Sequence, residues 1–148
     1  MAMEHEIEKK YQVLELPTNL NDYEYMEIEQ SYLNKGGAPI RLRKFKDRNS
    51  IRCVFSKKAR LEEGSFECIE HNIELPEDIY NQLVTAKEGR TIFKTRYRIP
   101  IDDNLNIDLD VFHDFFEGLC IAEIEYSSIE QANSFCVPNW LGKEVTTQ

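Results

Sequence analysis

The sequence lacks any long apolar run and is poor in positive charge. Among its 148 residues no stretch of ~20 apolar residues occurs, and the N-terminus carries no apolar signal core. These absences predict a cytoplasmic protein that does not enter a membrane. Lys and Arg number 18 against 27 Asp and Glu, so the formal net charge is −9. This balance argues against binding to nucleic acid or to an anionic membrane surface, which usually requires excess Lys and Arg.

Cysteine is scarce and scattered along the chain. Cys53, Cys68, Cys120 and Cys136 form no CxxC pair, which argues against a zinc ribbon or a thioredoxin-type redox site. Three of the four lie in apolar stretches, where a free cysteine behaves as a small hydrophobic side chain. We therefore expect buried free thiols.

The composition is that of one folded domain over residues 1–148. Hydrophobic residues make up 41% of the chain, including one Trp, seven Tyr and eight Phe, and this content argues against disorder. A chain of this length buries roughly 68–70% of its unfolded surface, which is enough for a core without disulfides. No repeat, low-complexity tract or linker divides the sequence.

Most of the chain alternates between polar and apolar residues with a period of two, the pattern of strands with two unlike faces. It predicts strands at Glu4–Tyr11, Met26–Leu33, Ile40–Phe45, Ile51–Lys58, Phe66–Ile73, Thr91–Ile99, Leu105–Phe112 and Leu119–Tyr126. Two helices are predicted: Glu77–Lys87, opened by Pro76, and a second that starts at a capping box in Ser127–Glu130 and ends before Pro138. The segment Leu16–Glu24 is expected to be a loop or a short helical turn. The expected fold is α+β, mainly antiparallel β with a few helices.

Several predicted strands carry charge of one sign along one face. Acids recur at Glu4, Glu6 and Glu8, at Asp108 and Asp110, and at Glu123 and Glu125, whereas bases recur at Arg41 and Arg43 and at Lys94, Arg96 and Arg98. One interpretation, and the commoner one, is an open sheet whose polar face is solvated. However, opposite charges on neighbouring strands stabilise a sheet by ~0.2–1 kcal/mol, and like charges destabilise it. The alternative is a cavity that takes divalent cations on its carboxylates and phosphate on its Arg and Lys side chains.

The charged rows lie within a set of short motifs that keep a definite order. The first is Glu6-Ile7-Glu8-Lys9-Lys10, an E-x-E-x-K sequence; the others are Ile28–Leu33, Ile40–Arg43, Lys94–Tyr97, Leu109–Phe112, Ala122–Tyr126 and Trp140–Thr146. A lone E-x-E-x-K is a weak signal, but the ordered set covers nearly the whole chain. The set resembles the CYTH superfamily, the triphosphate tunnel metalloenzymes, and is closest in motif form to the bacterial tripolyphosphatase-like branch.

The resemblance implies a closed antiparallel β-barrel, or tunnel, with charged faces inside and helices packed outside. It implies Mg²⁺ or Mn²⁺ held by Glu6, Glu8, Asp108, Asp110, Glu123 and Glu125. It implies a phosphate chain held by Lys10, Arg41, Arg43, Lys58, Lys94 and Arg96. Lys58 is preferred to Lys57 because, if Cys53 faces outward, the alternation turns Lys58 inward. Lys10 and Tyr32 are the catalytic candidates; Tyr32 either orients or deprotonates a water, or has only a packing role.

Two departures from the family pattern stand out. The family often has R-x-E-x-E on the strand after the lysine, but in Phe66-Glu67-Cys68-Ile69-Glu70 only Glu70 fits. The chain also ends at Gln148, where many relatives continue into another helix. We therefore expect the C-terminal helix to be absent and one mouth of the tunnel to be more open.

The function implied by the resemblance is metal-dependent hydrolysis of a short polyphosphate, most simply inorganic triphosphate. Three alternatives stay open: a class IV type adenylyl cyclase that converts ATP to cyclic AMP and pyrophosphate, a thiamine triphosphatase, and a non-catalytic polyphosphate-binding module. No apolar pocket for a base or thiazole ring is evident, although Phe45 and Tyr97 remain candidates for one. The metal, the true substrate and the choice between monomer and homodimer also stay open.

Overall fold

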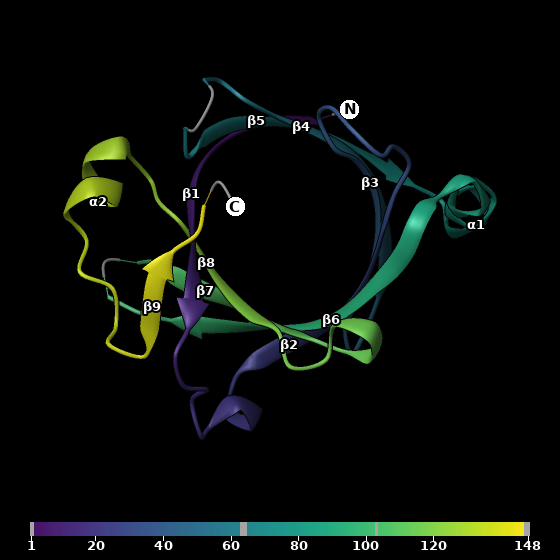
Figure 1. The fold of residues 1–148 in the computed structure, drawn as a ribbon. Coiled ribbons are helices and arrows are strands. Elements are labelled where there is room, and N and C mark those ends of the chain that lie inside the picture. The colour runs from purple at the N-terminus through teal and green to yellow at the C-terminus, as the bar shows by residue number, and fades with distance from the viewer. Residues whose placement is uncertain (1, 63–64, 103, 147–148) are drawn as a thin grey trace.

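The fold is a closed antiparallel β-barrel of eight strands (Figure 1). The computed structural model describes residues 2–62, 65–102 and 104–146. The barrel strands are β1 (Ala2–Val13), β2 (Glu24–Tyr32), β3 (Ile40–Lys46), β4 (Ile51–Arg60), β5 (Glu67–Leu75), β6 (Glu88–Pro100), β7 (Asn106–Phe112) and β8 (Cys120–Glu125). A ninth strand, β9 (Leu141–Glu144), lies beside β1. The predicted architecture, mainly β and closed into a tunnel, is confirmed.

Strand β1 closes the barrel because it has a partner on each of its edges. Neighbours around the sheet follow the order β5-β4-β3-β2-β6-β7-β8-β1, and β1 pairs again with β5. The first half of β1 pairs with β5, with Glu6 opposite Cys68. The second half pairs with β8 on the other edge, with Lys10 opposite Glu123. Strand β9 continues the edge that β5 occupies, since Tyr11 has partners on both β8 and β9.

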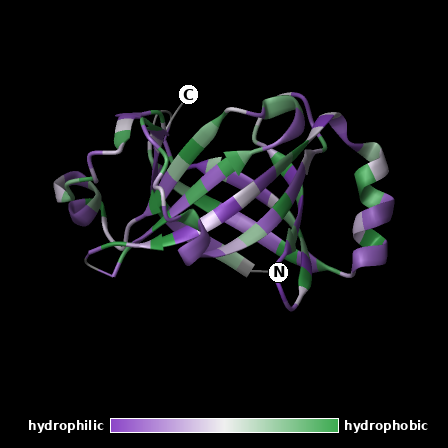
Figure 2. Cartoon of the chain, turned by 90° about the horizontal axis from the view of Figure 1, so that it is seen from below, coloured by the Kyte–Doolittle hydropathy of each residue, from purple (hydrophilic) through white to green (hydrophobic). Residues whose placement is uncertain are grey.

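Hydrophilic and hydrophobic residues alternate along the strands, as the banded colouring in Figure 2 shows, and the charged residues line the interior cavity. On β7, Asp108 and Asp110 line the interior cavity, whereas Ile107 and Leu109 belong to the largest apolar cluster. Successive side chains of a strand point to opposite faces, so one register places every charged row on the same side. The usual order of a globular core is thus inverted for most of this barrel.

Apolar clusters outside the barrel supply much of its hydrophobic core. One cluster includes Ile7, Leu109 and Ile124 together with Ala132 from helix α2 (Ile129–Ser134). A second includes Leu42 and Cys53 packed against Tyr80 of helix α1 (Glu77–Leu83). The two helices lie on different sides of the barrel exterior (Figure 1). Each fully buried aliphatic side chain contributes about 1.5–3 kcal/mol, so the tunnel is stabilised largely from outside.

The helices and the last strand differ in detail from the sequence prediction. The helix predicted to run to Lys87 is α-helical only to Leu83 and continues as the 3-10 turn η2 (Val84–Ala86). The N-cap of α2 is Ser128, whose side chain accepts a hydrogen bond from the backbone N–H of Gln131. The N-cap therefore lies one residue after Ser127, where the predicted capping box begins. Further 3-10 turns are η1 (Leu20–Asp22) and η3 (Asp114–Phe116).

The chain's helices are short. Among the residues that the structure describes, none forms a helix long and apolar enough to cross a membrane. Strand β9 was not predicted, because its pairing with β1 is visible only in three dimensions.

Candidate active site: a charged tunnel

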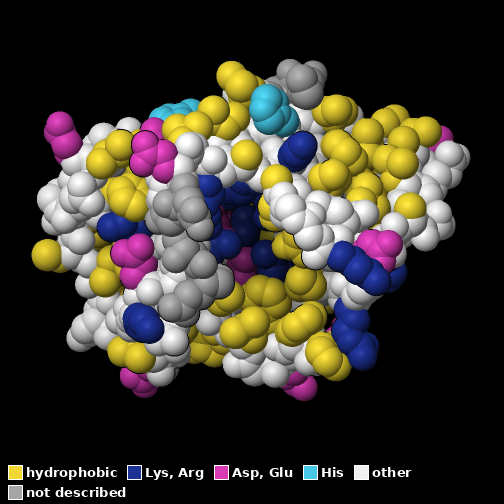
Figure 3. Space-filling view, turned by 45° about the horizontal axis from the view of Figure 1, so that its top comes forward, with side chains coloured by type: hydrophobic (Ala, Val, Ile, Leu, Met, Phe, Trp, Pro, Cys, Tyr) yellow, Lys and Arg dark blue, Asp and Glu magenta, His cyan; other side chains and the backbone are white. Residues whose placement is uncertain are grey.

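A cavity of about 1710 Å³ occupies the barrel interior. Figure 3 shows the hollow from one face, with Lys, Arg and acidic side chains visible inside it. Every site residue predicted from the sequence lines this cavity: Glu6, Glu8, Lys10, Tyr32, Arg41, Arg43, Lys58, Lys94, Arg96, Asp108, Asp110, Glu123 and Glu125. The strands therefore gather into one space residues that are up to 119 positions apart in the printed numbering, from Glu6 to Glu125.

In one part of the tunnel, two buried glutamates share one lysine. Lys58 Nζ lies 3.1 Å from Glu6 Oε2 and also contacts Glu8 Oε1. Lys58 points into the cavity, as the alternation along its strand predicts, whereas Lys57 is exposed outside the cavity. We call Glu6, Glu8 and Lys58 the acid-rich region.

Burial is the main influence on the titration of this region. It raises the pKa of Glu6 to about 7, with Glu8 and Glu70 adding to the effect and Lys58 opposing it. Burial alone would lower the pKa of Lys58, but the carboxylates of Glu8 and Glu6 raise it above its ordinary value. An additional positive charge near Glu6 would stabilise its ionised form.

In a second part of the tunnel, two arginines share one glutamate. Arg41 donates a hydrogen bond of 2.6 Å to Glu70 Oε2, and Arg43 Nη2 lies 3.3 Å from Glu70 Oε1. Arg43 also donates to the hydroxyl of Ser56 at 3.0 Å. Burial and the neighbouring Arg41 lower the pKa of Arg43 to about 10. Against the effect of burial, the two guanidinium groups hold the pKa of Glu70 below its usual value.

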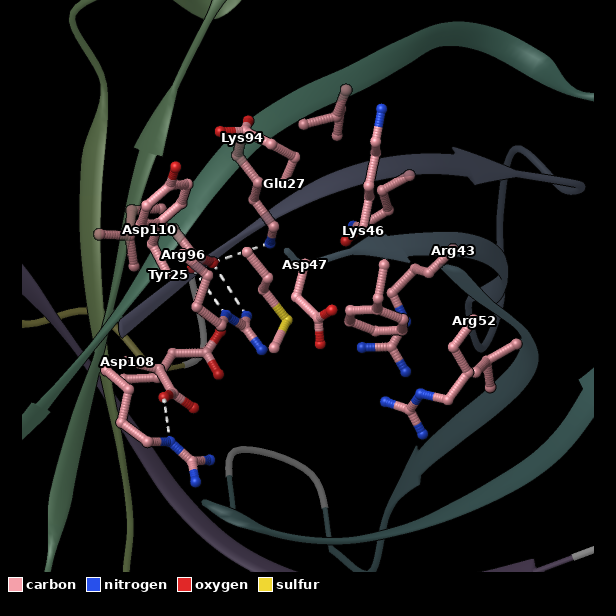
Figure 4. A pocket seen from close by; sticks show the side chains of 18 of the residues that line it. Tyr25, Glu27, Arg43, Lys46, Asp47, Arg52, Lys94, Arg96, Asp108 and Asp110 are labelled. Carbon is pink, nitrogen blue, oxygen red and sulfur yellow. Dashed lines mark hydrogen bonds and ion pairs between the residues drawn. The ribbon is translucent and has the colours of Figure 1, made fainter. Parts of the chain in front are cut away.

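The same arrangement recurs around Asp110 (Figure 4). Arg96 donates to both carboxylate oxygens of Asp110, at 2.8 and 3.0 Å, and Lys94 Nζ lies 2.8 Å from Oδ2. Asp110 is 1% exposed. Burial lowers the pKa of Lys94 in spite of Asp110, whereas the carboxylate outweighs burial for Arg96 and raises its pKa. We call these two clusters, around Glu70 and Asp110, the base-rich region.

The remaining acids lie beside each other across strand pairs. Glu8 is opposite Glu125, and Asp108 is opposite Glu123. Burial, together with neighbouring acids, raises the pKa of Asp108 and of Glu125. Burial would also raise the pKa of Glu123, but the positive charges of Arg96 and Lys10 outweigh burial, so the pKa of Glu123 is lowered. Lys10 Nζ lies 3.9 Å from Glu123 Oε1, a looser pairing than those of the base-rich region.

Within the described part of the chain, two groups of side chains have donor atoms close enough together to hold one cation. Glu6, Glu8 and Cys68 form one group and Glu4, Glu6 and Glu70 the other, with all donor atoms of a group within 4.8 Å of one another. Several carboxylate oxygens in one small space are the ligands that hard divalent cations prefer. The donor set therefore fits a divalent metal, with Glu6 common to both groups. Cys68 and Glu4 were not among the predicted ligands.

The two aromatic residues considered for an apolar pocket, Phe45 and Tyr97, lie on opposite faces of the barrel wall. Phe45 points into the barrel, where it forms a small apolar cluster with Met26, Ile28 and Val54. Tyr97 instead packs against the outer core. The hydroxyl of Tyr32 lies inside and accepts a hydrogen bond of 2.6 Å from the side-chain amide of Gln30. The interior thus contains an apolar patch that the sequence did not reveal.

Arg98 also lines the cavity and is loosely paired with Asp108 at 3.8 Å. Arg60 donates to the backbone carbonyls of Ser65 and Thr146, and Arg52 lies over the ring of Phe45. Arg52 lines the cavity and was missed; its place in the alternating strand with Lys58 was the signal available.

A closed antiparallel barrel that fills its interior with paired acids and bases defines a tunnel for a charged ligand. No protein-family model matches the chain. The inorganic triphosphatase of Nitrosomonas europaea is 30% identical over 141 residues, which is 95% of this chain and 89% of that protein. The chain belongs to the CYTH superfamily, the triphosphate tunnel metalloenzymes.

Solved structures give the same result for the fold. The crystal structure of the inorganic triphosphatase NE1496 matches with a TM-score of 0.63 and 29% identity, covering 95% of this chain and 86% of that one. A putative adenylyl cyclase from Hippeastrum, described as having a dominant triphosphatase activity, matches with a TM-score of 0.60 and 17% identity. That match covers 86% of this chain and 82% of the other, and it is similar in fold alone.

Proposed function

We propose that this protein is a divalent-metal-dependent hydrolase of inorganic triphosphate. The single observation that carries the proposal is the uneven pairing of charge inside the tunnel. In the acid-rich region two carboxylates share one cation, and in the base-rich region two cations share each carboxylate. Such a tunnel is complementary to a ligand that brings cations to one region and phosphates to the other. The relationship to an inorganic triphosphatase supports the same assignment.

The metal, Mg²⁺ or Mn²⁺ in this proposal, would be held by Glu6 and Glu8, with Glu123, Glu125 and Asp108 as further candidate ligands. When bound, it would supply charge neutralisation of phosphate oxygens and activation of water. Asp110 has a different place in the proposal from the one the sequence predicted. Because its two oxygens accept three interactions from Arg96 and Lys94, we assign it to positioning these bases.

Arg41, Arg43, Lys94 and Arg96 would bind the phosphate chain. Glu70 and Asp110 hold these four side chains in place before substrate arrives, and each carboxylate leaves other N–H donors of the guanidinium groups available. Arginine matches phosphate oxygens in a bidentate fork. Donors held ready in a water-poor site stabilise charge that develops on phosphate oxygens during transfer.

Two residues are proposed to act close to the reacting bond. The Lys10 side chain is 34% exposed and only loosely paired with Glu123. Its ammonium group can therefore move to stabilise the negative charge that develops on the leaving phosphate. The Tyr32 oxygen accepts a hydrogen bond from Gln30, which leaves its O–H free to donate. We therefore assign Tyr32 to orienting the attacking water or a phosphate oxygen.

Product analysis tests the proposal directly. Purified protein is incubated with inorganic triphosphate, ATP or thiamine triphosphate, each with Mg²⁺ or Mn²⁺ and with EDTA as a control. The expected result is phosphate and pyrophosphate from inorganic triphosphate, and no turnover in EDTA. Formation of cyclic AMP and pyrophosphate from ATP, or tight triphosphate binding without turnover under either metal, would overturn it.

The apolar patch inside the barrel favours one second candidate, a nucleoside triphosphate as substrate. Phe45, Met26, Ile28 and Val54 offer an apolar surface next to Arg43, as a base would require. The same assay compares the two candidates by their kcat/KM values. A Phe45→Ala variant is expected to lose activity on ATP alone if ATP uses this patch.

A further inference from the structure

Cys68 lies in the tunnel wall directly opposite Glu6. The two residues are cross-strand partners of β5 and β1, so their side chains leave the sheet on the same face. Cys68 is 0% exposed, and among the described residues its thiol has no hydrogen-bond partner. Its sulfur and one carboxylate oxygen each of Glu6 and Glu8 lie within 4.8 Å of one another.

We infer that Cys68 is a third metal ligand, which together with Glu6 and Glu8 makes a mixed sulfur–oxygen site for a thiophilic divalent cation such as Zn²⁺ or Co²⁺. The inference rests on the proposed function in taking the acid-rich region to be the metal end of the tunnel. It goes further by assigning the sulfur, so that thiophilic cations compete with Mg²⁺ or Mn²⁺ for Glu6 and Glu8.

The chemistry of the donors sets this preference. Mg²⁺ and Ca²⁺ take oxygen ligands and gain little from sulfur, whereas thiolate selects softer metals. Zinc binds sulfur at about 2.3 Å and carboxylate oxygen at about 2.0–2.2 Å. Donors at those distances around one ion are separated from one another by less than the 4.8 Å limit that the three side chains already meet, so binding requires only side-chain adjustment.

The position of Lys58 is consistent with a cation at this place. Its ammonium group contacts the same two carboxylates that would bind the metal, and so the site already stabilises one positive charge. An entering cation would replace the ammonium group of Lys58 at these carboxylates. As the metal–sulfur bond forms, the S–H bond breaks and its proton passes to the buffer.

Cobalt(II) provides a test that does not depend on hydrolysis. The whole protein is freed of metal with EDTA, exchanged into metal-free buffer and titrated with CoCl₂ in the absence of triphosphate. A sulfur-to-cobalt charge-transfer band is expected in the near ultraviolet, and ZnCl₂ is expected to abolish it by competition. The Cys53→Ser variant, in which a buried cysteine outside the barrel is replaced, should keep the band.

Cys68→Ser and Cys68→Ala should lose the band and bind Zn²⁺ at least about tenfold more weakly, since even outer-shell changes have effects of that size. Far-ultraviolet circular dichroism establishes that the variants are folded. The absence of a band in the unaltered protein, or its persistence in both folded Cys68 variants, would overturn the inference. If the unaltered protein shows the sulfur-to-cobalt band but does not cleave triphosphate, only the proposed function is overturned.

Discussion

The acid-rich and base-rich regions of the tunnel are built from the same kinds of residue in opposite proportions. Lys58 is shared by Glu6 and Glu8 in the first, whereas Asp110 is shared by Lys94 and Arg96 in the second. A shared partner satisfies each group only in part, and the excess charge has a different sign in each region. The comparison teaches that the ratio of acids to bases, more than their presence, determines what each region binds. Changing that ratio at single positions tests the comparison.

The largest effect is expected from Asp110→Asn. The change leaves Lys94 and Arg96 buried without their carboxylate, and removing one partner of a buried ion pair costs about 3–5 kcal/mol. Urea denaturation should show this loss in the free energy of unfolding. Asp108→Asn is the control: its partner Arg98 is 61% exposed, and a loss as large as that of Asp110→Asn would contradict the comparison.

The next effect concerns catalysis in the base-rich region. Arg43→Gln removes a positive charge beside Glu70 and should reduce kcat/KM for triphosphate by about 10²–10³, the size expected for losing one fixed donor to transition-state charge. Steady-state phosphate release measures it. Lys57→Gln, on the exposed outer face of the same barrel, should leave kcat/KM unchanged, and an equal loss there would point to a non-specific charge effect.

The acid-rich region should respond to pH in the metal-free protein. The pKa of Glu6 is raised to about 7 from 4.5, so between these values the folded state binds more protons than the unfolded state, and stability falls as pH rises. Glu6→Gln removes this contribution. Its free energy of unfolding should match that of the unaltered protein near pH 4.5 and exceed it at pH 8, by about 1–3 kcal/mol, since a tenfold change in proton affinity corresponds to about 1.4 kcal/mol.

Urea denaturation across this pH range in EDTA measures the difference. Glu24→Gln, at an exposed position on β2, serves as the matched control; because it keeps Glu6, its curve should run parallel to that of the unaltered protein. A Glu6→Gln curve that runs parallel to that of the unaltered protein would refute the prediction.

The smallest effect is expected at Tyr32. Tyr32→Phe removes the hydroxyl that we assign to orienting water or phosphate and should lower kcat about tenfold, which corresponds to roughly 1.4 kcal/mol, with little change in KM. Packing alone predicts unchanged kcat, because the phenyl ring is retained. Steady-state kinetics with triphosphate separates the two roles.

Alternation within single strands was enough to predict the strands and their rows of like charge, whereas the closed barrel and the candidate site residues were implied by the resemblance to the CYTH superfamily. Lys58 is one example of what alternation adds: its inward direction followed from the outward direction of Cys53, without any knowledge of strand pairing. The partners of the charged residues could not be predicted in this way. Glu70 and Arg41 interact because β3, β4 and β5 are adjacent, and Asp110 is held by two bases because β6 lies beside β7.

Cys68 was the largest omission, and its reason is physical. In sequence it lies between Glu67 and Ile69, in a segment that departs from the family pattern, and a free cysteine usually behaves as a small hydrophobic core residue. Only the pairing of β1 with β5, which joins residues about sixty positions apart, brings its sulfur to two carboxylates. The inward direction of Phe45 was available from its alternation with Arg41 and Arg43, but its packing against Met26, Ile28 and Val54 was not.

The pairing of β1 on both of its edges has a consequence for the order in which the barrel forms during synthesis on the ribosome. Strand β1 is made first, yet its partners β8 and β9 are made last. The half of β1 that carries Glu8 and Lys10 therefore has no β8 partner until that strand has been synthesised. Contacts between distant parts of a chain form slowly, and domains are completed only when their last segment emerges. The barrel, and the cavity inside it, therefore closes late in synthesis, when β8 pairs with β1.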